Sequence, residues 1–264
     1  MSADPNEPTT ASPTTTPTTT DTPAPATTAK KKRRFVEVGV ANAVFVRSDP
    51  GLVSMPPIDA AAPEVAFWGK SNVGKSSLLN ALMLKKGLVK TSKTPGHTQL
   101  LNQFGVTVNL RRRQRYLMLV DLPGYGFAQM PPAQQRKLQK MLGEYLSGRA
   151  GLSALVHLFD LRHPPTSLDV KTWEQLSVLT PARLVVGTKA DRVPKSKHRA
   201  HAKVIAQALG IHTDDVTVFS SEDRTGRAEL WGRILGATGV ATNDLFEVGE
   251  GAADVATSVS TGDG

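Results

Sequence analysis

The distribution of apolar residues divides the chain into short strand-like runs and longer segments with helical period. Consecutive or alternating apolar residues predict strands at 65–68, 99–110, 115–121, 152–159, 184–186 and 216–219. Apolar residues three or four positions apart predict helices at 76–83, 132–147, 167–179, 195–209 and 226–237. Strands that alternate with helices of this length are typical of βαβ units. We therefore expect a three-layer α/β/α fold with a mostly parallel six-stranded sheet and one antiparallel edge hairpin.

The two ends of the chain lack this pattern. Residues 1–29 contain no Val, Ile, Leu or Phe and cannot bury enough apolar surface to offset the entropy of ordering. Residues 35–40 alternate enough to predict a short strand, and 47–63 contain several Pro and Gly residues and predict a loop. We expect a disordered Thr/Pro-rich leader with a basic end at 1–34, one domain at 35–238, and a disordered tail at 239–264.

Composition limits the classes of function. The 264 residues include no cysteine, which excludes disulfides and thiolate metal sites. No apolar run approaches the roughly 18 residues of a membrane span, and the N-terminus lacks the apolar core of a secretory signal. We therefore expect a cytoplasmic protein without membrane insertion. The six histidines form no convincing ligand cluster, and the pair His198 and His201 predicts a solvated helix face rather than a zinc site.

Positive charge points to a class of partner. The formal net charge is +9, and basic residues cluster at 30–34 and at 111–115, between the two runs of the predicted hairpin. A strong positive balance favours nucleic acid as a partner. Either block alone is equally compatible with a solvated tail or hairpin tip.

Residues 69–76 follow the pattern G-x-x-x-x-G-K-[ST] between an apolar strand and a helix. Glycines let the backbone wrap a phosphate chain, and the following helix adds its positive N-terminal end. Lys75 can reach the β- and γ-phosphates, and the Ser76 hydroxyl can bind Mg²⁺. The pattern predicts a P-loop NTPase fold. The expected phosphate-binding residues are Gly69, Lys70, Ser71, Asn72, Val73, Gly74, Lys75, Ser76 and Ser77.

A second motif selects the base. The sequence T-K-A-D at 188–191 follows a predicted buried strand, at the end of the sheet where ligands bind in open α/β folds. The Asp191 carboxylate can accept two hydrogen bonds from guanine, whereas adenine would leave it unpaired. Lys189 can lay its stem over the base. F-S-S at 219–221 is placed to close over the base from the other side, although Ser220 and Ser221 are also compatible with a helix N-cap. The expected base-binding residues are Thr188, Lys189, Ala190, Asp191, Phe219, Ser220 and Ser221.

Two further segments are expected to sense the γ-phosphate. D-L-P-G at 121–124 ends a predicted strand, where Asp121 can hold Mg²⁺ through a water and the Gly124 N–H can meet the γ-phosphate. T-P-G-H-T at 94–98 lies in the loop after the first helix, where a threonine can bind Mg²⁺ when GTP is bound and release it afterwards. We favour Thr98 over Thr94 for this role. The expected residues are Thr94, Pro95, Gly96, His97, Thr98, Asp121, Leu122, Pro123 and Gly124.

With these motifs in place, residues 35–238 resemble the EngB (YihA/YsxC) family of bacterial GTP-binding proteins, in the TrmE-Era-EngA-like GTPase class. The matching segments are G-K-S-N-V-G-K-S-S-L-L-N at 69–80, T-S-K-T-P-G-H-T-Q-L-L-N at 91–102, D-L-P-G-Y-G-F-A at 121–128, L-R-H-P-P-T-S-L-D at 161–169, T-K-A-D at 188–191 and F-S-S at 219–221. His97 and Phe127 depart from the basic residue and the tyrosine usual in the family. The resemblance implies a role in assembling the large ribosomal subunit and an association with normal cell division and septation.

The residue after D-x-x-G bears on the rate of hydrolysis. Ras-like enzymes place a glutamine there to orient the attacking water, whereas this chain has Tyr125. We therefore predict slow intrinsic GTP hydrolysis and a switch rather than a turnover enzyme. No residue is predicted as a catalytic base; Lys75, Thr98 and Gly124 are expected to stabilise the transferring phosphate. Asn72 is either a ligand for K⁺, as in related GTPases with asparagine at this position, or a brace for the loop.

Two interpretations of the cellular role remain open. The first is a GTP-switched factor that binds the large ribosomal subunit or its precursor, through rRNA. The alternative is a septum-associated protein whose GTP state controls other partners, without a direct ribosome role. An ATP-driven enzyme is disfavoured by Asp191. We expect a monomer, because no heptad repeat argues for self-association.

Overall fold

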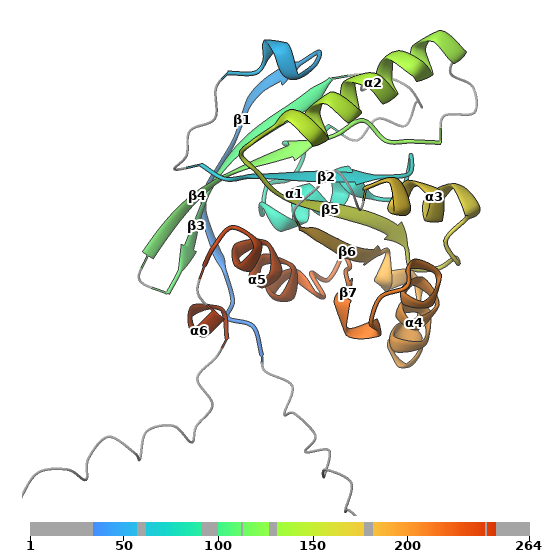
Figure 1. Ribbon diagram of the computed structural model, residues 1–264. Helices are drawn as coiled ribbons and strands as arrows, with labels where there is room; N and C mark the ends of the chain where they lie inside the picture. The colour runs from blue at the N-terminus through green and yellow to red at the C-terminus, as the bar shows by residue number, and fades with distance from the viewer. Residues whose placement is uncertain are drawn as a thin grey trace, which may run out of the picture. The chain divides into compact units, whose positions relative to one another are not determined.

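The sheet has seven strands, one more than the sequence predicts (Figure 1). The computed structural model describes residues 34–56, 62–90, 100–111, 113–126, 131–176, 182–240 and 242–246. The expected leader before residue 34 and the chain after 246 lie outside the described residues. The strands are β1 (Gly39–Asp49), β2 (Glu64–Gly69), β3 (Leu101–Leu110), β4 (Arg113–Asp121), β5 (Leu152–Asp160), β6 (Arg183–Thr188) and β7 (Val216–Val218).

The strand order explains where the parallel and antiparallel parts meet. Across the sheet the order is β1-β3-β4-β2-β5-β6-β7. From β4 through β7 every neighbouring pair is parallel, whereas β1, β3 and β4 pair antiparallel at one edge. The predicted hairpin is confirmed as β3 and β4, with Leu110 paired to Arg113 and Arg111 in a left-handed turn conformation at φ 54°. The carboxyl ends of β2, β5 and β6 therefore share one edge of the sheet, where ligands bind in such folds.

Helices cover both faces of the sheet, as the predicted three layers require (Figure 1). α1 and α5 pack on one face, and α2, α3 and α4 pack on the other. The α-helices are α1 (Lys75–Leu82), α2 (Pro132–Gly148), α3 (Ser167–Leu176), α4 (His198–Leu209), α5 (Arg227–Ala237) and α6 (Thr242–Leu245). Short 3-10 helices occur at Leu52–Ser54, Ala190–Arg192, Lys195–Lys197 and Thr213–Asp215.

The apolar run at 65–68 in the central strand β2 is explained by its burial on both faces. Val65 and Phe67 belong to the core under α1 and α5, and Ala66 belongs to the core under α2. All three are fully buried. A parallel strand covered on both faces has no solvent side, so its sequence is a continuous apolar run rather than an alternating one.

Two expectations at the edges of the domain differ from the structure. The N-terminal strand is not at 35–40; β1 begins at Gly39 and runs to Asp49, into the segment expected to be a loop. Most β1 side chains are exposed because this strand forms the outer edge of the sheet, and its apolar residues at 44–46 are consecutive rather than alternating. The packed chain also continues past the expected boundary at 238, because Phe246, just after α6, stacks on Phe35 with ring centroids 4.5 Å apart.

Candidate functional site

The phosphate loop leaves β2 and enters α1 through a turn that glycine makes possible. Asn72 and Gly74 have positive φ values of 63° and 103°. Gly74 precedes α1 and provides no side-chain cap, so the first N–H groups of the helix meet no acceptor from it. A β-carbon at Gly69 would lie 2.9 Å from the Leu158 carbonyl oxygen, so only glycine allows β2 to end this close to β5. These features suit an anion at the helix N-terminus.

The phosphate loop is fastened directly to the D-x-x-G segment. The Ser71 N–H donates to the Tyr125 carbonyl at 3.0 Å, and the Tyr125 N–H donates to the Gly69 carbonyl at 3.2 Å. A β-carbon on Gly124 would lie 3.2 Å from that same Gly69 oxygen. The Gly124 N–H donates to no atom of the described residues. The structure thus brings Gly124 against the phosphate loop with its amide donor unused.

Lys75 and Asp121, from two different motifs, form an ion pair. Their side chains are only 12% and 5% exposed. Asp121 is the last residue of β4, and Ser76 follows Lys75 in the first turn of α1. Among the described residues no three His, Asp or Glu side chains form a group suited to a metal. Proteins usually hold Mg²⁺ with one or two side chains together with nucleotide phosphates.

The T-K-A-D segment lies next to the phosphate loop. The Thr188 hydroxyl is buried 2.6 Å from the Val73 carbonyl oxygen, which ties the end of β6 to the loop. Lys189 adopts a left-handed conformation at φ 59°. Its Nζ donates to the Asn72 carbonyl at 2.7 Å. Segments more than 100 residues apart in the sequence therefore form one site.

Asp160, at the end of β5, belongs to the same site, although it was not predicted from the sequence. Its carboxylate accepts from Lys189 Nζ at 3.0 Å and from Arg162 Nη2 at 2.7 Å. Burial opposes its ionisation, but the hydrogen bonds from Arg162 and Lys189 hold the pKa of Asp160 well below its usual range. The carboxylate is thus charged at neutral pH and fixes the Lys189 side chain. The D-L-R triplet at 160–162 was the only available signal.

Asp191 is oriented by the F-S-S segment. The Ser220 hydroxyl is buried and donates to Asp191 Oδ1 at 3.2 Å, and the Phe219 carbonyl accepts from the Ala190 N–H at 3.1 Å. Ser220 Oγ also accepts the N–H groups of Glu222 and Asp223 in the following turn, but it caps no helix, since α5 begins only at Arg227. The Asp191 side chain is 22% exposed and also contacts Arg192 Nε at 3.0 Å. Each carboxylate oxygen therefore has a partner in this structure, Oδ1 with Ser220 and Oδ2 with Arg192.

The segment from Thr94 to Thr98 lies outside the described residues. The expected contacts of Thr94, Pro95, Gly96, His97 and Thr98 with nucleotide or magnesium therefore stay predictions. The same holds for Phe127 beyond the D-x-x-G segment.

Tyr125 turns its ring away from the phosphate loop into a polar cluster that the sequence did not predict. Its hydroxyl donates to Asp169 Oδ1 at 2.7 Å and lies 3.0 Å from His157 Nε2. Because the single hydroxyl proton goes to the carboxylate, His157 Nε2 must carry its own proton and donate to the tyrosine oxygen. The other ring nitrogen, Nδ1, is buried and has no hydrogen-bond partner among the described residues. Burial lowers the pKa of His157 to about 3, so the ring is neutral.

Asp169 is held in place independently of Tyr125. The Thr166 N–H and hydroxyl donate to Asp169 Oδ2 at 2.8 and 2.7 Å. This is the capping box of α3 and assigns Thr166, rather than Ser167, as the capping residue. Burial opposes ionisation of Asp169, but the bonds from Thr166 and Tyr125 keep its pKa below the usual value. Burial and the contact with Asp169 raise the pKa of Tyr125, so its hydroxyl stays protonated.

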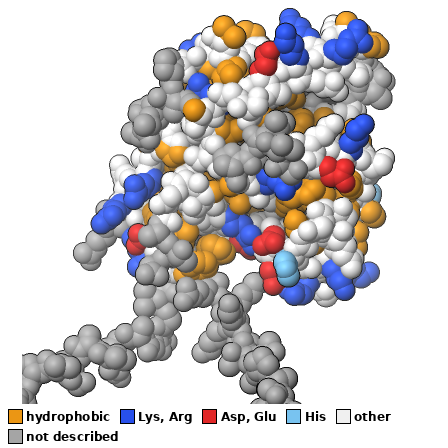
Figure 2. Space-filling model, viewed as in Figure 1, with side chains coloured by type: hydrophobic (Ala, Val, Ile, Leu, Met, Phe, Trp, Pro, Cys, Tyr) orange, Lys and Arg blue, Asp and Glu red, His pale blue; other side chains and the backbone are white. Residues whose placement is uncertain are grey.

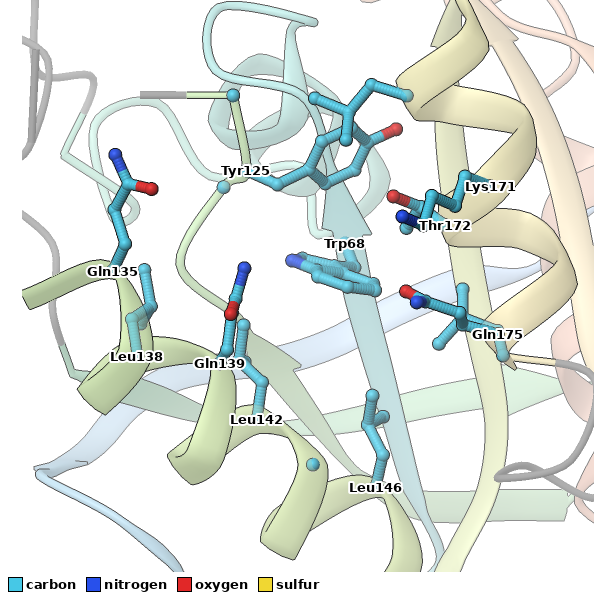
Figure 3. Close-up of a pocket in the computed structure, with 15 residues that line it drawn as sticks. Trp68, Tyr125, Gln135, Leu138, Gln139, Leu142, Leu146, Lys171, Thr172 and Gln175 are labelled. Carbon is cyan, nitrogen blue, oxygen red and sulfur yellow. The ribbon is translucent and has the colours of Figure 1, made fainter. Parts of the chain in front are cut away.

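A groove between α2 and α3 begins at Tyr125 (Figure 3). Its volume is about 750 Å³. Trp68 lies between the two helices, edge-on to Tyr125 with ring centroids 5.2 Å apart, and its indole N–H donates to the Pro123 carbonyl. The lining from α2 includes Gln135, Leu138, Gln139, Leu142 and Leu146, and that from α3 includes Leu168, Lys171, Thr172, Gln175 and Leu176. Tyr125 therefore contacts the phosphate loop through its backbone and the groove through its ring.

Comparison with solved structures defines the class. The crystal structure of a "probable GTP-binding protein engB" matches 66% of this chain and 98% of its own length, with a TM-score of 0.51 at 20% identity. A structure of Era in complex with MgGDPNP and a fragment of 16S ribosomal RNA matches 71% of this chain and 58% of its own, with a TM-score of 0.54 at 21% identity. With the phosphate loop and mixed sheet described above, this fold is that of a P-loop GTPase.

Sequence comparison gives the family. Residues 64–189 match the family model described as 50S ribosome-binding GTPase. "Probable GTP-binding protein EngB" of Geobacter metallireducens is 43% identical over 211 residues, which are 80% of this chain and 99% of that protein. The protein of the same description from Bacillus subtilis is 41% identical over 177 residues, 67% of this chain and 87% of its own. The chain belongs to the EngB family of GTP-binding proteins. Within the described part of the chain, every helix is too short or too polar to cross a membrane.

Proposed function

We propose that this protein is a GTP-regulated switch with slow intrinsic hydrolysis that acts in assembly of the large ribosomal subunit and is needed for normal cell division and septation. The main support for guanine-nucleotide binding is the contact between the phosphate loop at 69–76 and the T-K-A-D segment at 188–191. Lys189 Nζ donates to the Asn72 carbonyl, so the base-selecting and phosphate-binding segments are directly joined by a hydrogen bond. We further propose that the protein works in the cytoplasm as a monomer.

The phosphate loop would hold the nucleotide through its backbone N–H groups and the positive charge of Lys75. The amides of Asn72 and Gly74 and the first turn of α1 would donate to the phosphates, and Lys75 would move from Asp121 to the β- and γ-phosphates. Ser76, Thr98 and Asp121 would hold Mg²⁺, the last through a water. The ion neutralises charge on the phosphate oxygens when it is bound. The Gly124 amide, with no acceptor among the described residues, would meet the γ-phosphate.

Base selection would rest on Asp191. Its carboxylate, oriented by Ser220, accepts from guanine N1–H and the exocyclic amine. Lys189, fixed by Asp160, lays its stem along the base, and the Phe219–Ser221 segment closes the opposite side. Adenine would leave the Asp191 carboxylate without donors.

Slow hydrolysis follows from the position of Tyr125. In the reaction, water attacks the γ-phosphorus and the bond to the β–γ bridging oxygen breaks, giving GDP and phosphate. The Tyr125 hydroxyl donates to Asp169 and stays protonated, so it can neither take a proton from water nor orient it as a glutamine would. Asn72 could assist by binding K⁺ near the phosphates; equal hydrolysis rates in K⁺ and Na⁺ buffers would remove that role.

The arginine tip of the β3–β4 hairpin is the candidate surface for rRNA. We define it as Arg111, Arg112, Arg113 and Arg115, of which Arg112 lies outside the described residues. Figure 2 shows basic side chains gathered over this hairpin, beyond the edge of the helix layers. Phosphate contacts from arginine dominate affinity for nucleic acid. The ribosomal part of the proposal also draws on the family model's description and on the RNA-bound structure of Era.

Co-sedimentation with large ribosomal subunits and their precursors tests the proposal. The protein is expected to pellet with the particles in the presence of a non-hydrolysable GTP analogue and not with GDP. Replacing the arginine tip with glutamine should weaken binding and flatten its salt dependence. The log–log slope should fall by about 0.7 to 0.9 for each phosphate that the arginines no longer neutralise.

The alternative is a septum-associated, GTP-regulated protein without a direct ribosome role. It predicts no sedimentation with ribosomal particles in either nucleotide state, while guanine-nucleotide binding persists. An unchanged salt dependence after replacing the arginine tip would reduce that surface to a solvated hairpin end.

A further inference from the structure

Three elements hold the side chain of Tyr125, which follows the D-x-x-G motif. β5 provides His157, α3 provides Asp169, and the phenol oxygen sits between them at 3.0 and 2.7 Å. Trp68 of β2 packs against the ring edge. The Tyr125 side chain lies outside the nucleotide site, yet contacts from three elements fix its position.

The backbone of Tyr125 is equally constrained from the opposite direction. Its N–H and C=O form a two-bond bridge to the phosphate loop, at Gly69 and Ser71. Gly124, the residue immediately before it, lies so close to the Gly69 carbonyl that a β-carbon would be 3.2 Å away. Anchoring the phenol therefore restricts the peptide that presents the Gly124 N–H, the donor left unused in this structure.

We propose that Asp169 is a positioning residue that acts through Tyr125: by holding the phenol, it keeps the Gly124 amide in place for the γ-phosphate and so raises the ratio of GTP affinity to GDP affinity. The inference rests on the proposed nucleotide switch and goes beyond it. GDP lacks the γ-phosphate, so its affinity does not depend on Gly124. A loop that must be ordered at the moment of binding weakens affinity by the cost of ordering it.

Tyr125→Phe removes only the hydroxyl and leaves the ring, so it is the sharpest variant. We expect the affinity for a non-hydrolysable GTP analogue to fall about tenfold, the scale of a hydrogen bond to a charged group, while GDP affinity changes less than about twofold. Fluorescent guanine nucleotides titrated against each variant give both values. Tyr116→Phe is the matched control, because Tyr116 is an exposed tyrosine on β4 outside this cluster.

Asp169 also caps α3, so its removal needs a control for helix stability. Thr166→Ala breaks the capping box but leaves the Tyr125 bond to Asp169. A merely structural role would give Asp169→Ala and Thr166→Ala the same effect. The proposal expects only Asp169→Ala to lower the GTP-to-GDP affinity ratio, with Asp169→Asn, which keeps an acceptor, restoring most of it. The affinity ratio of the double variant Tyr125→Phe/Asp169→Ala should equal that of the more strongly affected single variant, because both substitutions remove the same hydrogen bond.

The outcomes separate this inference from the proposed function. A wild-type protein that binds neither GDP nor the analogue would overturn the nucleotide switch, and this inference with it. Wild-type binding with an unchanged affinity ratio in folded Tyr125→Phe would leave the switch standing and overturn the role of Asp169. Equal losses for GDP and the analogue would also overturn it, because the effect would then not reside at the γ-phosphate.

Discussion

Breaking the buried ion pair at the start of β2 should cost more stability than breaking any surface pair in the described chain. Glu64 accepts from Arg149 Nε at 2.9 Å, from a second nitrogen of the same guanidinium, and from the Tyr145 hydroxyl at 3.3 Å. The two charged side chains are 4% and 7% exposed. Arg149 also donates to the Pro56 carbonyl at 2.7 Å. The pair joins the end of α2 to the strand that leads into the phosphate loop.

Glu64→Gln keeps the shape of the side chain and removes its charge. Arg149 is then left charged and buried beside an amide nitrogen, a situation that costs about 3 to 5 kcal/mol in comparable buried pairs. Since about 2 to 4 °C of midpoint corresponds to each kcal/mol in a domain of roughly 200 residues, the thermal midpoint should fall by about 6 to 20 °C. Urea denaturation at pH 7 gives the free energy directly.

A matched control is available on the same helix. Lys140 and Glu144 form an exposed pair at 3.8 Å, with side chains 78% and 50% exposed. Glu144→Gln should change the free energy of unfolding by less than about 0.5 kcal/mol. Replacing both buried partners, as Glu64→Leu/Arg149→Met, should recover much of the loss, because no charge is then left unpaired. If Glu64→Gln is no more destabilising than Glu144→Gln, the reasoning from burial is wrong.

Two further predictions concern the nucleotide site and its surroundings. Asp191→Asn should lower GTP affinity by about 10² to 10⁴-fold, because two hydrogen bonds to a carboxylate are lost. The same variant should favour xanthine nucleotides, in which an oxygen replaces the exocyclic amine of guanine. Calorimetry measures both affinities, and the control Asp214→Asn, at an exposed position, should leave both unchanged. The pKa of His157 is about 3 in the folded protein, below its ordinary value near 6.5, so stability is full above about pH 6.5 and declines as pH falls toward 3, by up to about 1.4 kcal/mol per pH unit. Urea midpoints at pH 7, 6 and 5 should show a shallower decline for His157→Gln than for the wild type; parallel curves would contradict the assignment.

The nucleotide motifs could be predicted because their chemistry is local. Residues 69–76 and 188–191 each carry the required glycines, lysine or carboxylate within one turn, and the structure brings both segments together at the carboxyl ends of neighbouring strands. The alternation of strands and helices likewise gave the layers and the hairpin. Such signals survive because they depend on neighbours in sequence rather than on distant partners.

The parts that the sequence did not predict depend on distant partners. β1 is an edge strand whose exposed residues follow no alternation, and it exists because β3 pairs with it some 60 positions later. The cluster of Tyr125, His157 and Asp169 joins residues 32 and 44 positions apart, with no shared spacing or motif. The sequence indicates that Tyr125 cannot orient the attacking water as a glutamine would. Only the packing of β5 and α3 shows which side chains Tyr125 contacts instead.

The groove between α2 and α3 gives Tyr125 a thermodynamic consequence that runs in both directions. One end of the residue touches the phosphate loop and the other lines the groove. When a molecule in the groove and the nucleotide each bind one position of the ring more tightly than the other, each changes the other's affinity by the same factor. A tenfold preference on one side is therefore a tenfold preference on the other, whichever ligand arrives first.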